Sequence, residues 1–167
     1  MAKISKGVFD AGPIIHTYEI NNQLILEIVK EKFISVEVEK ELKKHKVQYK
    51  SIKIKELTGR NKDLAKFIYE KYYLELGEAT SIALSKQERI KFFFTDDLDA
   101  REVAKKLELN VHGTLGLLLR AFRENIITKE IALKSIKELK EKSTLFLTSD
   151  LLDWITTEIR KYKTSES

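Results

Sequence analysis

A chain of 167 residues, 34% of them charged and 43% hydrophobic, is long enough to bury the core of one globular domain. It contains no cysteine, which excludes disulfides, a thiolate nucleophile and cysteine-ligated zinc. No apolar run reaches membrane-spanning length and no signal core begins the chain, so we expect a cytoplasmic protein. The net charge of +5 suits either a polyanionic partner such as nucleic acid or simply a well-solvated surface.

Short apolar runs alternate with helical periodicity along the chain. The expected elements of the first part are a strand in GVFDAG, a helix opening at Pro13, an amphipathic helix over 21–32, a short strand over 33–35, a helix over 36–45, and a strand over 50–57 with its isoleucines inward. The second part predicts helices over 61–76 and 77–89, a fully buried strand over 91–95, a helix over 99–109, a short strand over 110–113, and helices over 114–125, 129–142 and 149–162. This alternation predicts an α/β layer structure with a parallel sheet in a single domain over 1–167, the last helices (about 129–162) packing on the same core.

Acidic residues follow two of the predicted strands. Asp10 ends the first strand, and Asp96 and Asp97 end the fourth. Ligands of open α/β sheets bind at the carboxyl ends of the strands, so these acids would face each other if the two strands were neighbours. Each could instead cap the helix that follows, because Asp is a common N-cap residue.

Two predicted helices supply further candidates. Glu78 lies in the first turn of GEATSIALSKQER, among small residues that allow a helix to approach a sheet closely; it could simply favour the helix dipole. Glu37 and Glu41 both flank the apolar stripe of VEVEKELKKH, and periodicity does not choose between them. Solvated acids are the ordinary interpretation of all three.

Convergence of these carboxylates would require a cation. Three or four of them in one cleft repel one another, and some would take up protons unless a positive ion were present. Mg²⁺ and Mn²⁺ prefer oxygen ligands, and Mg²⁺ commonly bridges protein carboxylates to a substrate phosphate.

The stretches VFDAGPIIH, VEKEL, LGEATSIAL and FFFTDDLDAREVAKKLELNVHGTLGLLLRA resemble the PIN-domain ribonucleases, and more narrowly their VapC-like toxin branch. The similarity covers about residues 6–160, and its most specific part is the block from Thr95 to Ala121. It implies a three-layer fold with a five-stranded parallel sheet of order 3-2-1-4-5 flanked by helices. It also implies an acid quartet that binds Mg²⁺ or Mn²⁺ and hydrolyses phosphodiester bonds in RNA.

Carried over by motif, the quartet falls on Asp10, Glu41, Glu78 and Asp97, with Thr95 as a supporting hydroxyl. Two positions depart from the family pattern. Position 78 carries Glu where Asp is usual, which alters the geometry of the site. Asp96 stands where Asn is common, so Asp96 remains an alternative ligand to Asp97, because successive strand residues point to opposite faces.

Two further stretches concern partners. Lys50, Lys53 and Lys55 belong to a stretch of six lysines over 43–55 that could guide an RNA backbone, or could protect a sheet edge from unwanted strand pairing. The aromatic residues of KFIYEKYY are typical of core packing; otherwise they would form an interface with an antitoxin or with a second copy in a homodimer.

The hypothesis is therefore a metal-dependent endoribonuclease, the toxin of a type II toxin–antitoxin pair. The alternative is a catalytically inactive PIN-like module that binds RNA or protein. A nucleotide fold is disfavoured because the chain has neither G-x-G-x-x-G nor a P-loop.

Overall fold

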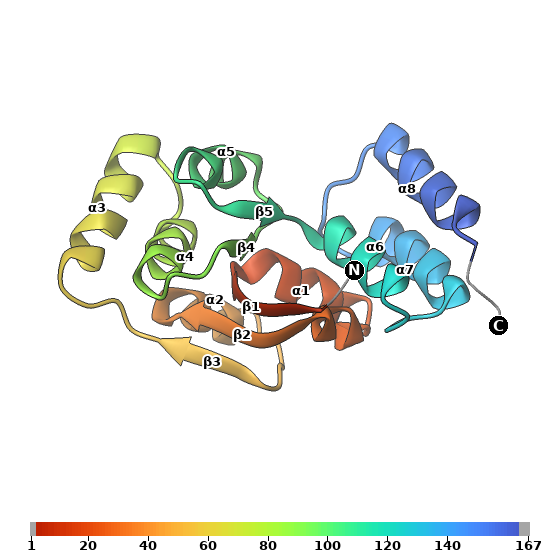
Figure 1. Cartoon of the computed structure of the whole chain (residues 1–167), viewed down its shortest axis with the longest axis horizontal. Helices are drawn as coiled ribbons and strands as arrows, with labels where there is room; N and C mark the ends of the chain where they lie inside the picture. Colours follow the sequence, from red (N-terminus) through yellow and green to blue (C-terminus); the bar gives the residue numbers. More distant parts are fainter. Residues whose placement is uncertain (1–2, 164–167) are drawn as a thin grey trace.

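A five-stranded, all-parallel sheet of order β3-β2-β1-β4-β5 forms the centre of the protein in the computed structural model, which describes residues 3–163 (Figure 1). The strands are β1 (Ile4–Phe9), β2 (Val29–Ser35), β3 (Ile52–Lys55), β4 (Phe92–Phe94) and β5 (Asn110–His112). Helices flank the sheet, so the predicted fold class and strand order are confirmed.

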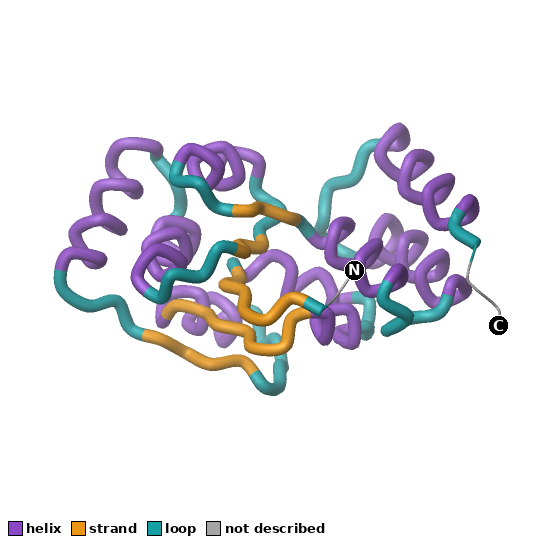
Figure 2. Tube along the Cα trace, in the orientation of Figure 1, coloured by secondary structure: helices purple, strands orange, loops and turns teal. Residues whose placement is uncertain are grey.

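The helices account for most of the remaining chain (Figure 2). They are α1 (Ala11–Glu19), the 3₁₀ helix η1 (Gln23–Ile28), α2 (Val36–Lys44), α3 (Arg60–Tyr72), α4 (Leu76–Gln87), α5 (Leu98–Lys106), α6 (Thr114–Arg123), α7 (Lys129–Lys142) and α8 (Ser149–Lys161). No helix within residues 3–163 combines the length and apolarity needed to cross a membrane.

The two central strands are buried on both faces. Val8 pairs in register with Phe93, and Phe9 with Phe94. All four side chains are at most 1% exposed, as expected for strands covered by helices on both sides. Because successive side chains point to opposite faces, Phe9 packs in one apolar cluster and Val8 in the other.

Each cluster joins a different group of helices to the sheet. The cluster around Phe9 includes buried side chains of α1, α2, α6, α7 and α8, among them Leu139 and Ile155. The cluster around Val8 includes side chains of α3, α4 and α5, among them Ile68 and Ile82. Both groups of helices therefore hold β1 and β4 in fixed positions, and those two strands carry the acidic residues at their carboxyl ends.

The predicted amphipathic helix over 21–32 is wrong. The chain instead forms η1 and then enters β2 at Val29, which pairs with Ile4 of β1. Parallel pairing and burial of Ile25, Leu26 and Ile28 outweigh the local helical pattern. The ammonium of Lys32 is buried in β2 and donates to the carbonyl of Val29 at 3.0 Å.

Three smaller corrections concern exposure and helix ends. Helix α1 begins at Ala11, and Pro13 lies in its first turn, where a missing N–H leaves no hydrogen bond unmade. Ile54 on the edge strand β3 is 41% exposed rather than inward. The core interpretation of the α3 aromatics is wrong for Phe67, Tyr69 and Tyr73, which are exposed.

Candidate active site

A cavity of about 270 Å³ opens at the carboxyl edge of the sheet, where the strand order reverses between β1 and β4. Its lining contains all four predicted quartet members, the alternative ligand Asp96, and several other side chains. The acidic members are Asp10, Glu41, Glu75, Glu78, Asp96 and Asp97; the others are Gly12, His16, Thr144, Leu145 and Phe146. Residues far apart in the chain thus meet at the point where α/β sheets commonly bind ligands.

Asp10 is the most deeply placed acid. The pairing of β1 with β4 continues into the Asp10 backbone N–H, which donates to the carbonyl of Phe94 at 2.9 Å. Its Oδ2 accepts a 2.9 Å hydrogen bond from the hydroxyl of the buried Thr95. Burial, reinforced by the charges of Glu41 and Asp96, raises the pKa of Asp10 to about 7 despite the Thr95 hydrogen bond.

Glu78 lies beside Asp10, in the first turn of α4. Its Oε2 accepts a hydrogen bond from the backbone N–H of Glu75 at 3.0 Å, which holds the side chain at the N-terminal end of α4. Burial, with the neighbouring charges of Asp10 and Asp97, raises the pKa of Glu78 to about 8. A capping box uses one oxygen of Glu78, and neither this hydrogen bond nor the expected interaction with the helix dipole explains the position of the side chain in the cavity.

Gly77 leaves the space between two of these acids open. A Cβ at this position would lie 3.2 Å from Oε2 of Glu41 and 3.7 Å from Oδ1 of Asp10. A side chain here would fill the acidic cavity, so the absence of one keeps the carboxylate oxygens accessible. The signal in the sequence is the Gly of GEA, directly before the acid.

The structure distinguishes Glu41 from Glu37, which helical periodicity alone could not do. Glu41 is half-buried in α2 and lines the acidic cavity, and burial together with Glu75 raises its pKa. Glu37, one turn earlier, forms a 3.1 Å ion pair with Lys40 and lines a different cavity. Glu41 is therefore the α2 glutamate with access to the other acids.

Asp96 is held by protein groups on nearly every side. Its Oδ1 accepts from the backbone N–H of Thr114 at 2.7 Å, and its Oδ2 accepts from the Thr114 hydroxyl at 2.5 Å. The Nδ1 of His16 lies 2.6 Å from Oδ2, and Arg101 lies 3.7 Å from Oδ1. Burial alone would raise the pKa of Asp96, but the hydrogen bonds from His16 and Thr114 outweigh it and lower the pKa.

The carboxylate of Asp97 has fewer hydrogen-bond partners in the protein than the carboxylate of Asp96. Oδ1 of Asp97 caps α5 by accepting from the backbone N–H of Ala100 at 2.7 Å, and its own N–H donates to the Thr95 hydroxyl at 3.2 Å. The side chain is exposed to solvent and lines the cavity. The capping interpretation is correct for one oxygen, and the second oxygen remains available to a ligand.

Three parts of the cavity were not predicted. Glu75 precedes α4 and adds a sixth carboxylate, which the sequence signals only as one more acid beside LGEA. His16 serves as a partner of Asp96 rather than as an ordinary packing residue. The loop between α7 and α8 brings in Thr144, Leu145 and Phe146, and no local pattern indicates that so distant a segment would reach the site.

The lysines of the predicted RNA-guiding stretch lie elsewhere. Lys53 pairs with Glu31 at 2.8 Å and Lys55 with Glu88 at 3.7 Å. Lys50 is exposed and lines a separate cavity with Tyr49 and Lys43. None of the three lines the acidic cavity.

The donor set fits a hard divalent cation. All acidic donors are oxygens, and burial is the main cause that raises the pKa values of Asp10, Glu41 and Glu78, so a cation in the cavity would favour their charged forms. Within residues 3–163, no three His, Cys, Asp or Glu side chains stand at the spacing of a formed metal shell, so the carboxylates surround the cavity without meeting at one point.

The fold and the cavity together define an α/β protein with a carboxylate-lined site at the edge of its sheet where the strand order reverses. A family model described as PIN domain matches residues 6–161, and the chain belongs to the PIN-domain family. PIN domains are generally nucleases, so membership indicates nuclease-type, hydrolytic chemistry. No curated protein and no solved structure matches the chain in the corresponding searches.

Proposed function

We propose that this protein is a metal-dependent endoribonuclease that hydrolyses phosphodiester bonds in RNA. The observation that supports it best is the meeting of Asp10, Glu41, Glu78 and Asp97 around one cavity, from four separate segments of the chain. A purely structural role would not need acids whose pKa values are raised by burial and by one another.

Asp10, Glu41, Glu78 and Asp97 would hold Mg²⁺ or Mn²⁺, and Asp96 would support them from its hydrogen-bonded position. When bound, such an ion lowers the pKa of a coordinated water and stabilises charge on phosphate oxygens. The protein's own contribution is orientation. Thr95 fixes Oδ2 of Asp10, the Glu75 backbone fixes Glu78, and the α5 cap fixes Asp97. Asp10 and Glu78 would be deprotonated when they hold such a cation, because its positive charge would offset the cost of burying their negative charges.

The finer biological role is also a proposal. The resemblance to VapC-like toxins supports a cytoplasmic toxin paired with an antitoxin, and the exposed aromatics of α3 offer a surface for that protein or for a homodimer. Phe67, Tyr69 and Tyr73 are 52%, 47% and 92% exposed. Phe67 and Tyr69 lie in α3 and Tyr73 directly follows it, and large exposed rings gathered in this way are more typical of interfaces than of free surface.

The decisive experiment is cleavage of a panel of single-stranded RNAs by the full chain with Mn²⁺, with Mg²⁺ and with chelator. Glu41→Gln removes a quartet carboxylate, and Glu37→Gln is its matched control, one turn away on the same helix and outside the cavity. We expect chelator and Glu41→Gln to abolish cleavage and Glu37→Gln to retain it. Absence of cleavage together with absence of Mn²⁺ binding heat in calorimetry would establish the inactive module instead.

A further inference from the structure

A second cavity, of about 640 Å³, continues directly from the acidic one. The two share Asp96, Asp97, Leu145 and Phe146 in their linings. From this shared rim the second cavity runs between the α5–β5 region and the start of α8. A polymer with one phosphate in the acidic cavity therefore meets this groove on leaving it.

The groove is unusually apolar for a surface. Its lining includes four large hydrophobic side chains with high exposure: Leu98 at 70%, Phe146 at 87%, Leu151 at 40% and Trp154 at 52%. Leu151 and Trp154 lie three positions apart and therefore share a face of α8. Exposed apolar groups gathered beside a polar site mark a place where a ligand is bound.

The loop between α7 and α8 holds the side chain of Phe146 in an outward-facing position. Its neighbours Leu145 and Leu147 pack against the core, so the alternation of an extended chain directs Phe146 away from it. Thr144 anchors the loop through its N–H and hydroxyl, which donate to Glu19 at 3.1 and 2.8 Å. Thr148 then caps α8 by accepting from the N–H of Leu151. The ring is thus displayed with little further ordering needed on binding.

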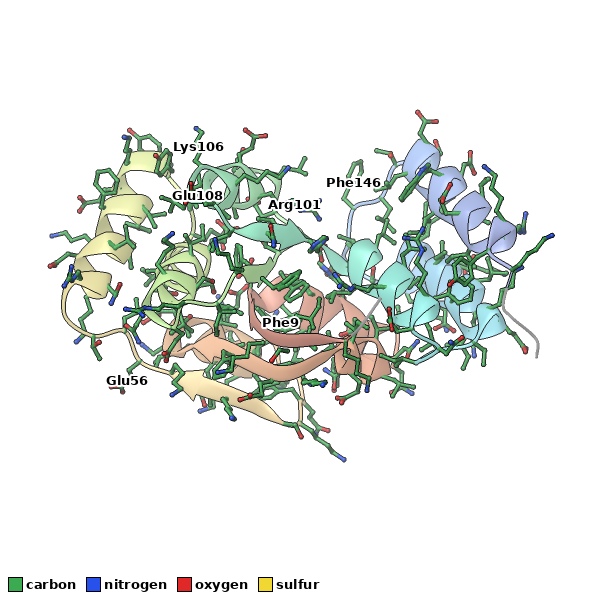
Figure 3. The ribbon with its side chains drawn as sticks, in the orientation of Figure 1. Phe9, Glu56, Arg101, Lys106, Glu108 and Phe146 are labelled. Atoms are coloured by element: carbon green, nitrogen blue, oxygen red, sulfur yellow. The ribbon has the colours of Figure 1, made fainter. Side chains whose placement is uncertain are left out.

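The opposite wall carries an arginine that is already paired. Arg101 of α5 donates from Nε to the carbonyl of Thr95 at 2.9 Å, its side chain is 31% exposed, and its guanidinium lies 3.7 Å from Oδ1 of Asp96. In Figure 3 the labelled Arg101 and Phe146 lie on the two sides of the space between α5 and α8. Because Asp96, Asp97 and Asp99 share this lining with Arg101, the feature that suits a nucleotide is the pair of exposed aromatic rings, on which a base can stack.

We infer that this groove binds the nucleotide next to the scissile phosphate in an unpaired state, with its base stacked on Phe146 and Trp154. This inference rests on the proposed nuclease function. A base inside a duplex is already stacked on its neighbours and offers no free face to either ring. A nucleotide is favoured over a second protein copy because the groove shares its rim with the acidic cavity, where the scissile phosphate would bind.

Trp154 provides a direct probe, since it is the single tryptophan of the chain. The full-length protein in chelator is titrated with a seven-nucleotide single-stranded RNA and with a longer blunt-ended RNA duplex that contains the same sequence. We expect the single strand to quench Trp154 fluorescence and the duplex to leave it unchanged. Phe146→Ala should weaken binding by roughly 5- to 100-fold, and Phe146→Tyr should restore it. Phe67→Ala, which removes an exposed ring on helix α3, outside the groove, should have no effect.

Kinetics with Mn²⁺ provide the second readout. Phe146→Ala should raise KM by the same factor while kcat changes little, because Phe146 positions the substrate and does not touch the reacting atoms. If the protein cleaves RNA but Phe146→Ala keeps the wild-type KM and no quenching occurs, the stacking inference fails and the nuclease proposal stands. Quenching without cleavage under any metal would overturn the nuclease proposal alone. A dimer in sedimentation that Phe146→Ala dissociates would assign the groove to self-association and overturn the inference.

Discussion

Asp96 and Asp10 line the same acidic cavity, but their surroundings shift their pKa values in opposite directions. Asp96 receives hydrogen bonds from Thr114 and His16 and an ion pair from Arg101, and its pKa is lowered. Asp10, which also lines the cavity, is buried, accepts hydrogen bonds from the Thr95 hydroxyl and the Ala11 backbone, and lies near the charges of Glu41 and Asp96; its pKa is raised to about 7. We therefore expect Asp96 to serve the fold and Asp10 to bind an external cation.

The largest expected effect is on catalysis by Asp10→Asn. Removing a charged ligand should lower cleavage by more than about 100-fold, since even outer partners of metal ligands are worth roughly 10–100-fold. Metal-free Asp10→Asn should be at least as stable as the wild type, because Asn removes a buried charge and keeps the Thr95 hydrogen bond. Cleavage with Mn²⁺ and thermal unfolding in chelator measure the two effects. Loss of both activity and stability would make Asp10 a structural residue.

Asp96→Asn should reverse that pattern. The amide cannot accept from His16 and Thr114 as the carboxylate does, and it leaves Arg101 without its counter-charge. We expect a loss of about 2–3 kcal/mol of unfolding free energy, with cleavage reduced less than in Asp10→Asn. Urea unfolding and single-turnover cleavage test this. A variant of wild-type stability that no longer cleaves RNA would make Asp96 the ligand in place of Asp97.

The pH dependence of the unfolding free energy tests the raised pKa of Asp10. The pKa of Asp10 is about 7 in the folded protein and 3.8 as its ordinary value, so between these values the folded state holds a proton that the unfolded state has lost. Stability conferred by that proton is full below pH 3.8 and disappears as the pH rises through 7. For Asp10 alone, metal-free protein should lose roughly 2–3 kcal/mol between pH 5 and pH 8.

Mn²⁺ should restore the lost stability at pH 8, since it stabilises the charged form of the acids. Asp10→Asn should remove the contribution of Asp10 and leave a shallower fall from Glu78, whose pKa is also raised, whereas Glu37→Gln should leave the profile unchanged. Thermal melts across this pH range, with chelator and with Mn²⁺, measure all three. A wild-type profile that rises from pH 5 to pH 8 in chelator would contradict the raised pKa values on which this argument depends.

Most of the fold follows from sequence patterns that the packing reinforces. Val8, Phe9, Phe93 and Phe94 are apolar without alternation, as strands buried on both faces require, and the strand–helix rhythm predicts their parallel pairing. The segment over 21–32 could not be predicted in this way. Its helical spacing is real, but pairing of Val29 with Ile4 depends on a distant strand, which local periodicity does not reveal.

The site was predictable as far as motifs extend. Asp10 and the Asp96–Asp97 pair follow from strand ends, whereas the choices of Asp97 over Asp96 and of Glu41 over Glu37 rest on the family resemblance. The partners of Asp96 were not predictable, because His16 and Thr114 are distant from it in the chain and have no charge pattern of their own. The same is true of Phe146, which tertiary packing of α7 and α8 brings to the rim.

The lysines of the 43–55 stretch also differ in whether an acidic residue pairs with them. Substituting them should have the smallest effect of those predicted here, and the effect should be on RNA binding. Lys53 is paired with Glu31, whereas exposed Lys50 has no ion-pair partner within residues 3–163. Lys50→Gln should therefore weaken RNA binding slightly and reduce the slope of log affinity against log salt by about 1. Lys53→Gln should change it less, because Glu31 already neutralises that charge.

Lys134→Gln on α7, which replaces a lysine beside Glu138, is the matched control and should leave the slope unchanged. Filter binding of a single-stranded RNA at several salt concentrations gives all three slopes. Equal slopes for wild type and Lys50→Gln would mean that the lysine stretch protects the β3 edge from pairing and does not contact RNA. A larger change for Lys53 than for Lys50 would mean that RNA displaces Glu31, so that an ion pair seen in the free protein does not identify a structural charge.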